Sequence, residues 1–84
     1  MKTNDLKKDT RILLQNGWYA KLLDNKKGNI RFAEVHGIVT EMGFIYSHDI
    51  VAYDVPGKPG WQTDIEYTKS QLDCHRMNQD LLGG

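Results

Sequence analysis

The sequence contains a single cysteine, Cys74, among its 84 residues. One cysteine excludes an intramolecular disulfide, and with it the small secreted folds that disulfides hold together. The chain also lacks an apolar run near the ~20 residues that a membrane-spanning helix requires. Its first residues, Met1–Lys8, are too polar for a secretion signal. These absences predict a cytoplasmic protein with no membrane partner.

Residue spacings typical of metal and catalytic sites are missing as well. No pair of histidines or cysteines has the Cys-x-x-Cys or His-x-x-x-His spacing of a zinc site. Cys74 and His75 are adjacent and tend to point apart on a helix, which disfavours a shared metal ion. Nothing in the sequence indicates an oxyanion hole for a Cys74 nucleophile. We therefore predict no metal, no cofactor and no catalytic residue. The candidates considered are His36, His48, Asp49, Cys74 and His75.

Charge of one sign is scarce in each half of the chain, although the whole chain is neutral. Residues 1–31 carry eight basic and three acidic side chains, a net +5, and residues 32–84 carry three and eight, a net −5. If the fold keeps the halves apart, this split can steer a charged partner. If strand pairing mixes them, the two fields largely cancel. The sequence leaves both outcomes open.

The strongest local signal is a β-hairpin. Asn16-Gly17 lies between the apolar runs Thr10–Leu14 and Trp18–Leu23, and Asn-Gly in that setting favours a tight turn. A two-residue loop would mix apolar and polar residues on each face, whereas a three-residue loop with Gly17 at positive φ keeps the faces separate. We predict the three-residue loop. It buries one face, formed by Ile12, Leu14, Trp18, Ala20 and Leu22.

Further short strands follow, separated by turn residues such as Glu41–Gly43, Ser47–Asp49 and the loop Pro56–Gly60. Thr68 and Gln71 fit a capping box for a helix at about 69–82. We predict one domain, residues 1–84, with its β part at about 10–67. This spacing predicts a mainly β fold, either a small closed barrel or a strongly bent antiparallel sheet of five to six strands, with a C-terminal helix. The strands expected after the hairpin are Asn29–Val35, Ile38–Thr40, Phe44–Tyr46, Ile50–Val55 and, with looser alternation, Trp61–Tyr67.

Eight aromatic residues are more than a core of this size can bury. Trp61 follows the Pro/Gly loop and is either a lid on the core or an exposed anchor for a partner. With its neighbours it would form an acidic, aromatic surface that suits a protein with a basic groove. The residues of this predicted partner-binding surface are Trp61, Tyr53, Asp54, Asp64, Glu66 and Tyr67.

The alternative is a face that binds nucleic acid through basic and aromatic side chains. The sequence pI of about 6.8 is low for such a domain. We therefore favour protein binding and keep nucleic-acid binding as the second hypothesis. The residues of the predicted nucleic-acid face are Arg11, Tyr19, Lys21, Lys26, Lys27 and Arg31.

Three stretches together, Thr10–Trp18, Asp24–Asn29 and Tyr46–Ile50, resemble small uncharacterised proteins of bacteriophages and prophages. This resemblance implies a protein that binds and blocks a host protein, such as part of a defence system, and it implies no catalytic residues. More loosely, residues Thr10–Val55 look like SH3-like or KOW small barrels. That likeness implies a barrel that binds nucleic acid.

Overall fold

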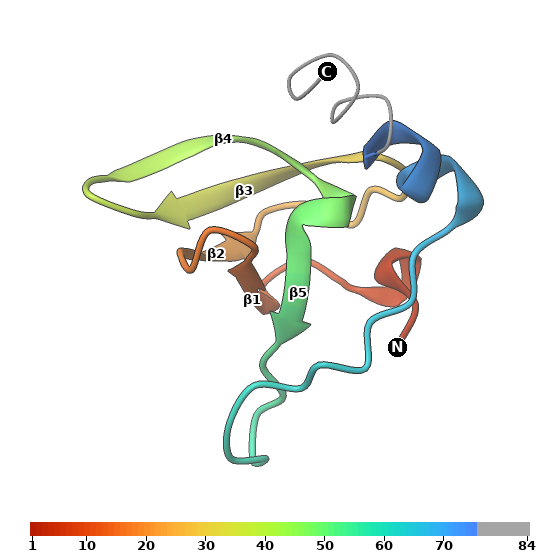
Figure 1. Ribbon diagram of the computed structural model, residues 1–84. Helices are drawn as coiled ribbons and strands as arrows, with labels where there is room; N and C mark the ends of the chain where they lie inside the picture. The colour runs from red at the N-terminus through yellow and green to blue at the C-terminus, as the bar shows by residue number, and fades with distance from the viewer. Residues whose placement is uncertain (76–84) are drawn as a thin grey trace.

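The computed structural model describes residues 1–75 and shows a mainly β fold built on one antiparallel sheet (Figure 1). The strand order is β4-β3-β2-β1-β5. Within the described residues β4 and β5 do not pair with each other, so the sheet is open. The bent sheet is therefore the correct alternative, and the closed barrel is not formed. The strands are β1 (Arg11–Leu14), β2 (Tyr19–Leu22), β3 (Ile30–His36), β4 (Thr40–Tyr46) and β5 (Ile50–Tyr53).

The first hairpin has the predicted register. Ile12 lies opposite Ala20, the Leu14 N–H donates to the Trp18 carbonyl at 2.7 Å, and Gly17 has a φ of 91°. The side chains predicted to be buried on this face are buried, with one exception. Trp18 is 42% exposed, so its predicted place in the core is wrong. It lies at the rim of the sheet, where its ring packs against the next hairpin turn instead of entering the core.

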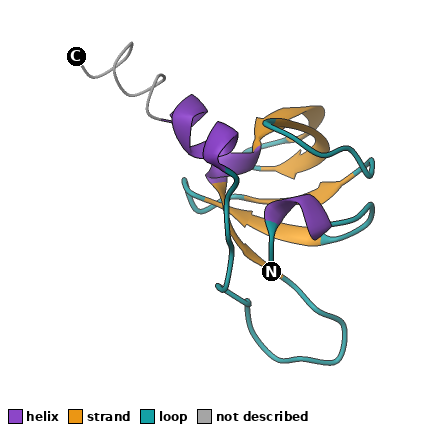
Figure 2. Cartoon of the chain, turned by 90° about the vertical axis from the view of Figure 1, so that its right-hand side faces the viewer, coloured by secondary structure: helices purple, strands orange, loops and turns teal. Residues whose placement is uncertain are grey.

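The second hairpin is longer and more regular than predicted. The residues Glu41–Gly43 do not form a turn, because β4 runs without interruption and pairs with β3 along its whole length. The chain reverses earlier, between His36 and Thr40. Gly43 keeps an extended backbone opposite Ala33, so it does not break the strand. This hairpin extends away from the rest of the molecule (Figure 1), and in the view of Figure 2 it points away from the viewer.

The predicted last strand at Trp61–Tyr67 is also wrong. This stretch makes only isolated bridges, Tyr53 with Gln62 and Lys2 with Glu66. The Pro56–Gly60 loop reverses the chain after β5, and the returning segment pairs with β5 through the single bridge of Tyr53 with Gln62. The β part of the domain therefore ends at Tyr53 and not near residue 67.

Short helical segments complete the fold. A 3-10 turn, η1 (Thr3–Asp5), precedes β1, and a second, η2 (Ser47–Asp49), joins β4 to β5. A helix covers residues 69–75, and its capping box is confirmed. The Thr68 N–H donates to Gln71 Oε1 at 2.9 Å, and the Gln71 N–H donates to Thr68 Oγ1 at 3.2 Å. The predicted end of this helix near residue 82 lies outside the described residues.

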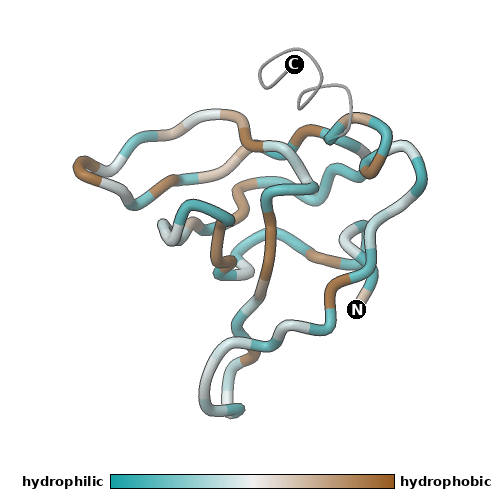
Figure 3. The backbone as a smooth tube through the Cα atoms, in the orientation of Figure 1, coloured by the Kyte–Doolittle hydropathy of each residue, from teal (hydrophilic) through white to brown (hydrophobic). Residues whose placement is uncertain are grey.

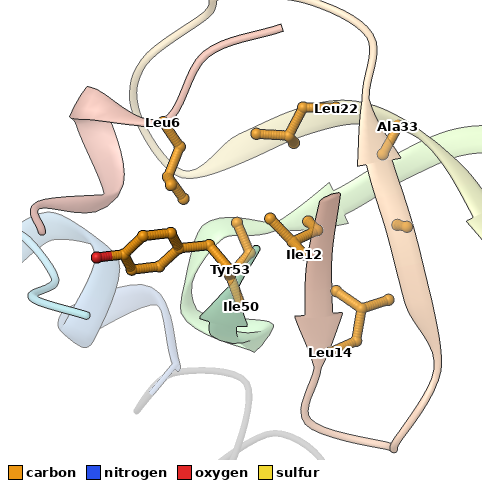
Figure 4. Packing of buried hydrophobic residues seen from close by; sticks show 8 residues of the cluster. Leu6, Ile12, Leu14, Leu22, Ala33, Ile50 and Tyr53 are labelled. Carbon is orange, nitrogen blue, oxygen red and sulfur yellow. The ribbon is translucent and has the colours of Figure 1, made fainter. Parts of the chain in front are cut away.

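The core is small and lies off the centre of the sheet. It packs β1, β2, β3 and β5 against the segment that follows η1 (Figure 4). The end of the β3–β4 hairpin receives none of this packing, and Figure 3 shows that its tip is nevertheless hydrophobic. Among residues 1–75, no helix has the length and apolar character needed to cross a membrane. The buried core residues are Leu6, Ile12, Leu14, Ala20, Leu22, Ala33, Ile50 and Tyr53.

Candidate functional site

The two tyrosines of the predicted partner-binding surface are engaged inside the fold. Tyr53 is only 7% exposed, and its hydroxyl donates to Asp64 Oδ1 at 2.6 Å. The Tyr67 hydroxyl donates to the carbonyl of Ile50. Both bonds hold the returning chain against β5. Tyr53 is therefore not available to a partner, because its ring belongs to the core.

The other members of that set are spread along an irregular segment. Trp61 is 37% exposed, Asp64 and Glu66 are exposed, and Asp54 is half-buried. Hydrogen bonds from the Tyr53 hydroxyl and from the N-terminal amine lower the pKa of Asp64. Because Asp64 already holds these two groups, it works as a structural residue. The acidic surface is thus reduced to separate exposed side chains around Trp61.

The structure brings together only half of the predicted nucleic-acid face. Arg11, Tyr19 and Lys21 share the outer face of the first hairpin, because Arg11 pairs with Lys21 across the ladder. The Arg11 guanidinium lies 5.4 Å from the centre of the Tyr19 ring on the outer face of the first hairpin. Lys21 lies opposite Glu34 in the ladder, and the Glu34 carboxylate lies 3.0 Å from His36 Nε2. Lys26 and Lys27 are exposed in the loop between β2 and β3.

Arg31, the last member of the nucleic-acid face, is 1% exposed, so its predicted place on that face is wrong. Its Nε donates to Ser47 Oγ at 2.9 Å, and its Nη2 donates to the Thr3 carbonyl at 3.1 Å and to Asn4 Oδ1 at 2.9 Å. Burial lowers its pKa, and the carboxylate of Asp24 acts in the opposite direction. Arg31 joins three parts of the chain and offers no charge to a ligand.

A surface that is not among the predicted ones lies on β4. Along this edge strand Met42 is 70% exposed and Phe44 is 72% exposed. Strand alternation places both side chains on the outer face of the sheet, where the Phe44 ring lies 5.3 Å from the ring of Phe32. We call the apolar residues of this face the outer patch. It consists of Ile30, Phe32, Met42, Phe44 and Tyr46.

The opposite face of the same strand borders a groove of about 550 Å³. Its floor is apolar because Val35 and Ile45 lie beside Gly43, which has no side chain to fill the space. We call this hollow the inner groove. Among the described residues that line it, the charged ones are Glu41 and Asp49, and both are acidic. The remaining lining residues include Leu14, Gln15, Asn16, Trp18, Met42, Phe44 and Tyr46.

Between the outer patch and the inner groove runs an open backbone edge. The Ser47 N–H donates to the Asn29 carbonyl at 2.8 Å, and the Leu23 N–H donates to the Phe32 carbonyl at 3.0 Å. In an antiparallel ladder the bonded pairs alternate. It follows that odd-numbered residues of β4 bond to β3, and that even-numbered ones direct their N–H and C=O groups outward. Within residues 1–75 no other backbone segment pairs with that edge.

The sequence itself carries a signal for the outer patch. Met42, Phe44 and Tyr46 alternate with other residues in the pattern of a strand face. The turn predicted at Glu41–Gly43 breaks that pattern, so these residues are not predicted to share one strand. The backbone edge has no such signal, because strand order follows from the packing of the whole sheet.

His48, just after the end of β4, packs against aromatic neighbours within the fold. The His48 ring stacks on Tyr46 at 5.0 Å and lies 4.8 Å from the ring of His75. Burial lowers the pKa of His48, Asp49 raises it and His75 lowers it. In the described part of the chain, no three His, Cys, Asp or Glu side chains gather as metal ligands would.

Comparison of the whole chain with protein families, with curated proteins and with solved structures gave no match. The site is therefore interpreted from its own geometry, which combines an exposed apolar edge strand with an acidic-lined apolar groove.

Proposed function

We propose that this protein is a cytoplasmic, non-enzymatic module that binds another polypeptide along strand β4. The observation that carries the proposal is the exposure of Met42 and Phe44 on a seven-residue edge strand. Isolated apolar side chains on a surface need no explanation, but contiguous apolar patches in monomers usually mark interaction sites.

The character of the strand supports this assignment. Natural proteins protect long edge strands with lysine, proline, a bulge or a covering segment. Strand β4 contains neither lysine nor proline, and its pairing with β3 has no bulge. Aromatic side chains such as Phe44 and Tyr46 dominate the energetics of protein interfaces. A strand with these properties is suited to being covered by a partner.

The resemblance to phage proteins suggests the class of partner, a host protein that the module blocks. Binding of nucleic acid has less support. Arg31, a residue of the predicted nucleic-acid face, is buried, and the acidic residue Glu34 lies opposite Lys21 in the ladder. The proposal therefore places the interface on β4 instead of the first hairpin.

Site-specific photo-crosslinking in a nuclease-treated bacterial lysate tests this function. A photoreactive phenylalanine analogue replaces Phe44 in one variant and Leu72, which is 48% exposed on the terminal helix, in a control. We expect a discrete protein adduct from position 44 and none from position 72. Excess unlabelled parent protein should abolish the adduct, and unlabelled Phe44→Asp should compete at least roughly tenfold less well.

Equal adducts from the two positions would contradict the proposal, because they would mean non-specific capture. Adducts that form only before nuclease treatment would favour the nucleic-acid alternative.

A further inference from the structure

We propose that the segment bound by β4 is an extended strand that pairs with its free backbone edge and carries a basic side chain opposite Glu41. This inference rests on the proposed function and specifies the partner's chemistry. The segment has apolar residues at alternate positions, which face the inner groove, and lysine or arginine at its ends.

The free backbone edge of β4 provides the main-chain hydrogen bonds for binding. The outward N–H and C=O groups of Met42 and Phe44 are arranged to exchange hydrogen bonds with an added strand. The ladder of β3 and β4 continues over seven residue pairs, so a partner of similar length meets a regular template. Main-chain bonds of this kind give affinity without reading the partner's sequence.

The inner groove selects the side chains of the bound segment. In an added antiparallel strand, the residues opposite Gly43 and Ile45 point to the groove side of the sheet. They would rest on the apolar floor beside Val35, in space that Gly43 leaves open. A β-branched or other medium-sized apolar residue fits each of these two positions.

The acidic residues of the inner groove favour a basic side chain in the bound segment. The groove carries Glu41 at one end and Asp49 among its other lining residues, and none of the lining residues within 1–75 is basic. The partner residue opposite Glu41 shares its face of the sheet, so a lysine or arginine there gains a cross-strand ion pair. A like charge at that position is unfavourable, which gives the site a preference for basic segments.

The same charges argue against a second copy of this chain as the occupant. Full antiparallel overlap of two β4 strands places Gly43 opposite Gly43. Each Glu41 then lies opposite Ile45 of the other copy, in the groove that Asp49 already makes acidic. Self-pairing therefore adds a carboxylate where a basic group is favoured.

Amide hydrogen exchange followed by NMR tests the inference with a defined probe. The probe is acetyl-Lys-Thr-Val-Thr-Val-Thr-Lys-amide, which places valines opposite Gly43 and Ile45 and a lysine opposite Glu41. At a free peptide concentration of about nine times Kd, exchange of the Met42 and Phe44 amides should slow roughly tenfold, since only a tenth of the protein stays free. The Gly43 and Ile45 amides already bond to β3, so they should change little.

Matched peptides and variants separate the contributions. Replacing the central threonine by proline removes an N–H that faces β4, and should weaken binding roughly three- to tenfold. Replacing both lysines by glutamates should weaken it roughly tenfold or more. The protein variant Glu41→Lys should reverse that charge preference. Asp5→Lys, at an exposed position of η1 outside the β3–β4 hairpin, should leave it unchanged.

Equal binding of the lysine and glutamate peptides would overturn the assigned charge preference. Amide protection that rises with protein concentration in the absence of peptide would instead identify a second copy as the occupant. If position 44 crosslinks to a protein while no peptide protects the two amides, the proposed function stands and strand addition fails. If neither occurs, both fail.

Discussion

At the scale of single residues, the most consequential finding is a group of polar side chains buried in the fold. Arg31, Gln71, Thr3 and Ser47 are each at most 1% exposed. Gln71 accepts a bond from Thr3 Oγ1 and donates from Nε2 to the Gly28 carbonyl at 2.8 Å. Because buried polar groups are costly unless they are paired, this network fixes one arrangement of the segments it joins.

Arg31→Ala should lower the free energy of unfolding by about 2–4 kcal/mol, because it strands buried acceptors and leaves a cavity. Urea denaturation of parent and variant measures the difference. The control is Lys27→Ala, an exposed basic residue, which should change stability by less than about 0.5 kcal/mol. An Arg31→Ala variant as stable as the Lys27→Ala control would show that the network contributes little.

At the scale of elements, the two hairpins meet where Trp18 lies across the second turn. A Cβ placed on Gly37 would lie 2.5 Å from Trp18 Cε3, much closer than side chains approach in real structures. Gly37 is therefore required by close contact and not by a positive φ. The same indole also lines the inner groove, so the turn and the groove share one wall.

Gly37→Ala should displace the Trp18 ring and destabilise the protein by about 1–3 kcal/mol through overpacking. Gly43→Ala is the matched control, because nothing lies within 4 Å of the Cβ position at Gly43. Urea denaturation with tryptophan fluorescence, in a Trp61→Phe background so that only Trp18 reports, measures both effects. A Gly37→Ala variant with the parent's emission and stability would contradict the close packing.

At the scale of the whole molecule, the strand order decides what the uneven charge of the sequence means. The acidic half of the chain supplies both edge strands, β4 and β5, while the basic half supplies β1 and β2 between them. The two halves are thus interleaved, and Lys21 lies opposite Glu34. Strand pairing thus joins the two halves in one sheet, which favours the mixing of charges over long-range steering by separated halves.

The stability of the whole molecule should fall as the pH drops from about 7.5 to about 5, because of His48. Burial depresses the pKa of His48 in the folded state. The unfolded chain then binds the proton more tightly, so stability is greatest above the unfolded pKa of about 6.5 and declines below it. The pKa of Asp64 is also depressed, and its contribution is lost only at more acidic pH.

Urea denaturation across this range, for the parent and for His48→Gln, measures the effect. The variant should lose less stability on acidification, because residue 48 no longer takes up a proton. Parallel pH curves for the two proteins would rule out His48 as the origin.

Local chemistry could be predicted from the sequence because the interacting groups are near neighbours along the chain. The turn at Gly17 sets the register of the first hairpin, since a one-residue slip would expose Ile12 and Ala20. The capping box at Thr68 needs only its own turn of helix. The mainly β class follows from the spacing of such signals.

Only the tertiary structure decided which surfaces are covered. Arg31 is buried because β3, η1 and η2, which are distant in the sequence, converge on it and supply acceptors for its guanidinium. Phe44 is exposed because it lies on the outer face of an edge strand, away from the core, whereas Ile45 on the inner face of the same strand packs against the core. The alternation of residues in the sequence specifies which face of a strand each side chain occupies. Whether anything packs on that face depends on how the whole sheet is assembled.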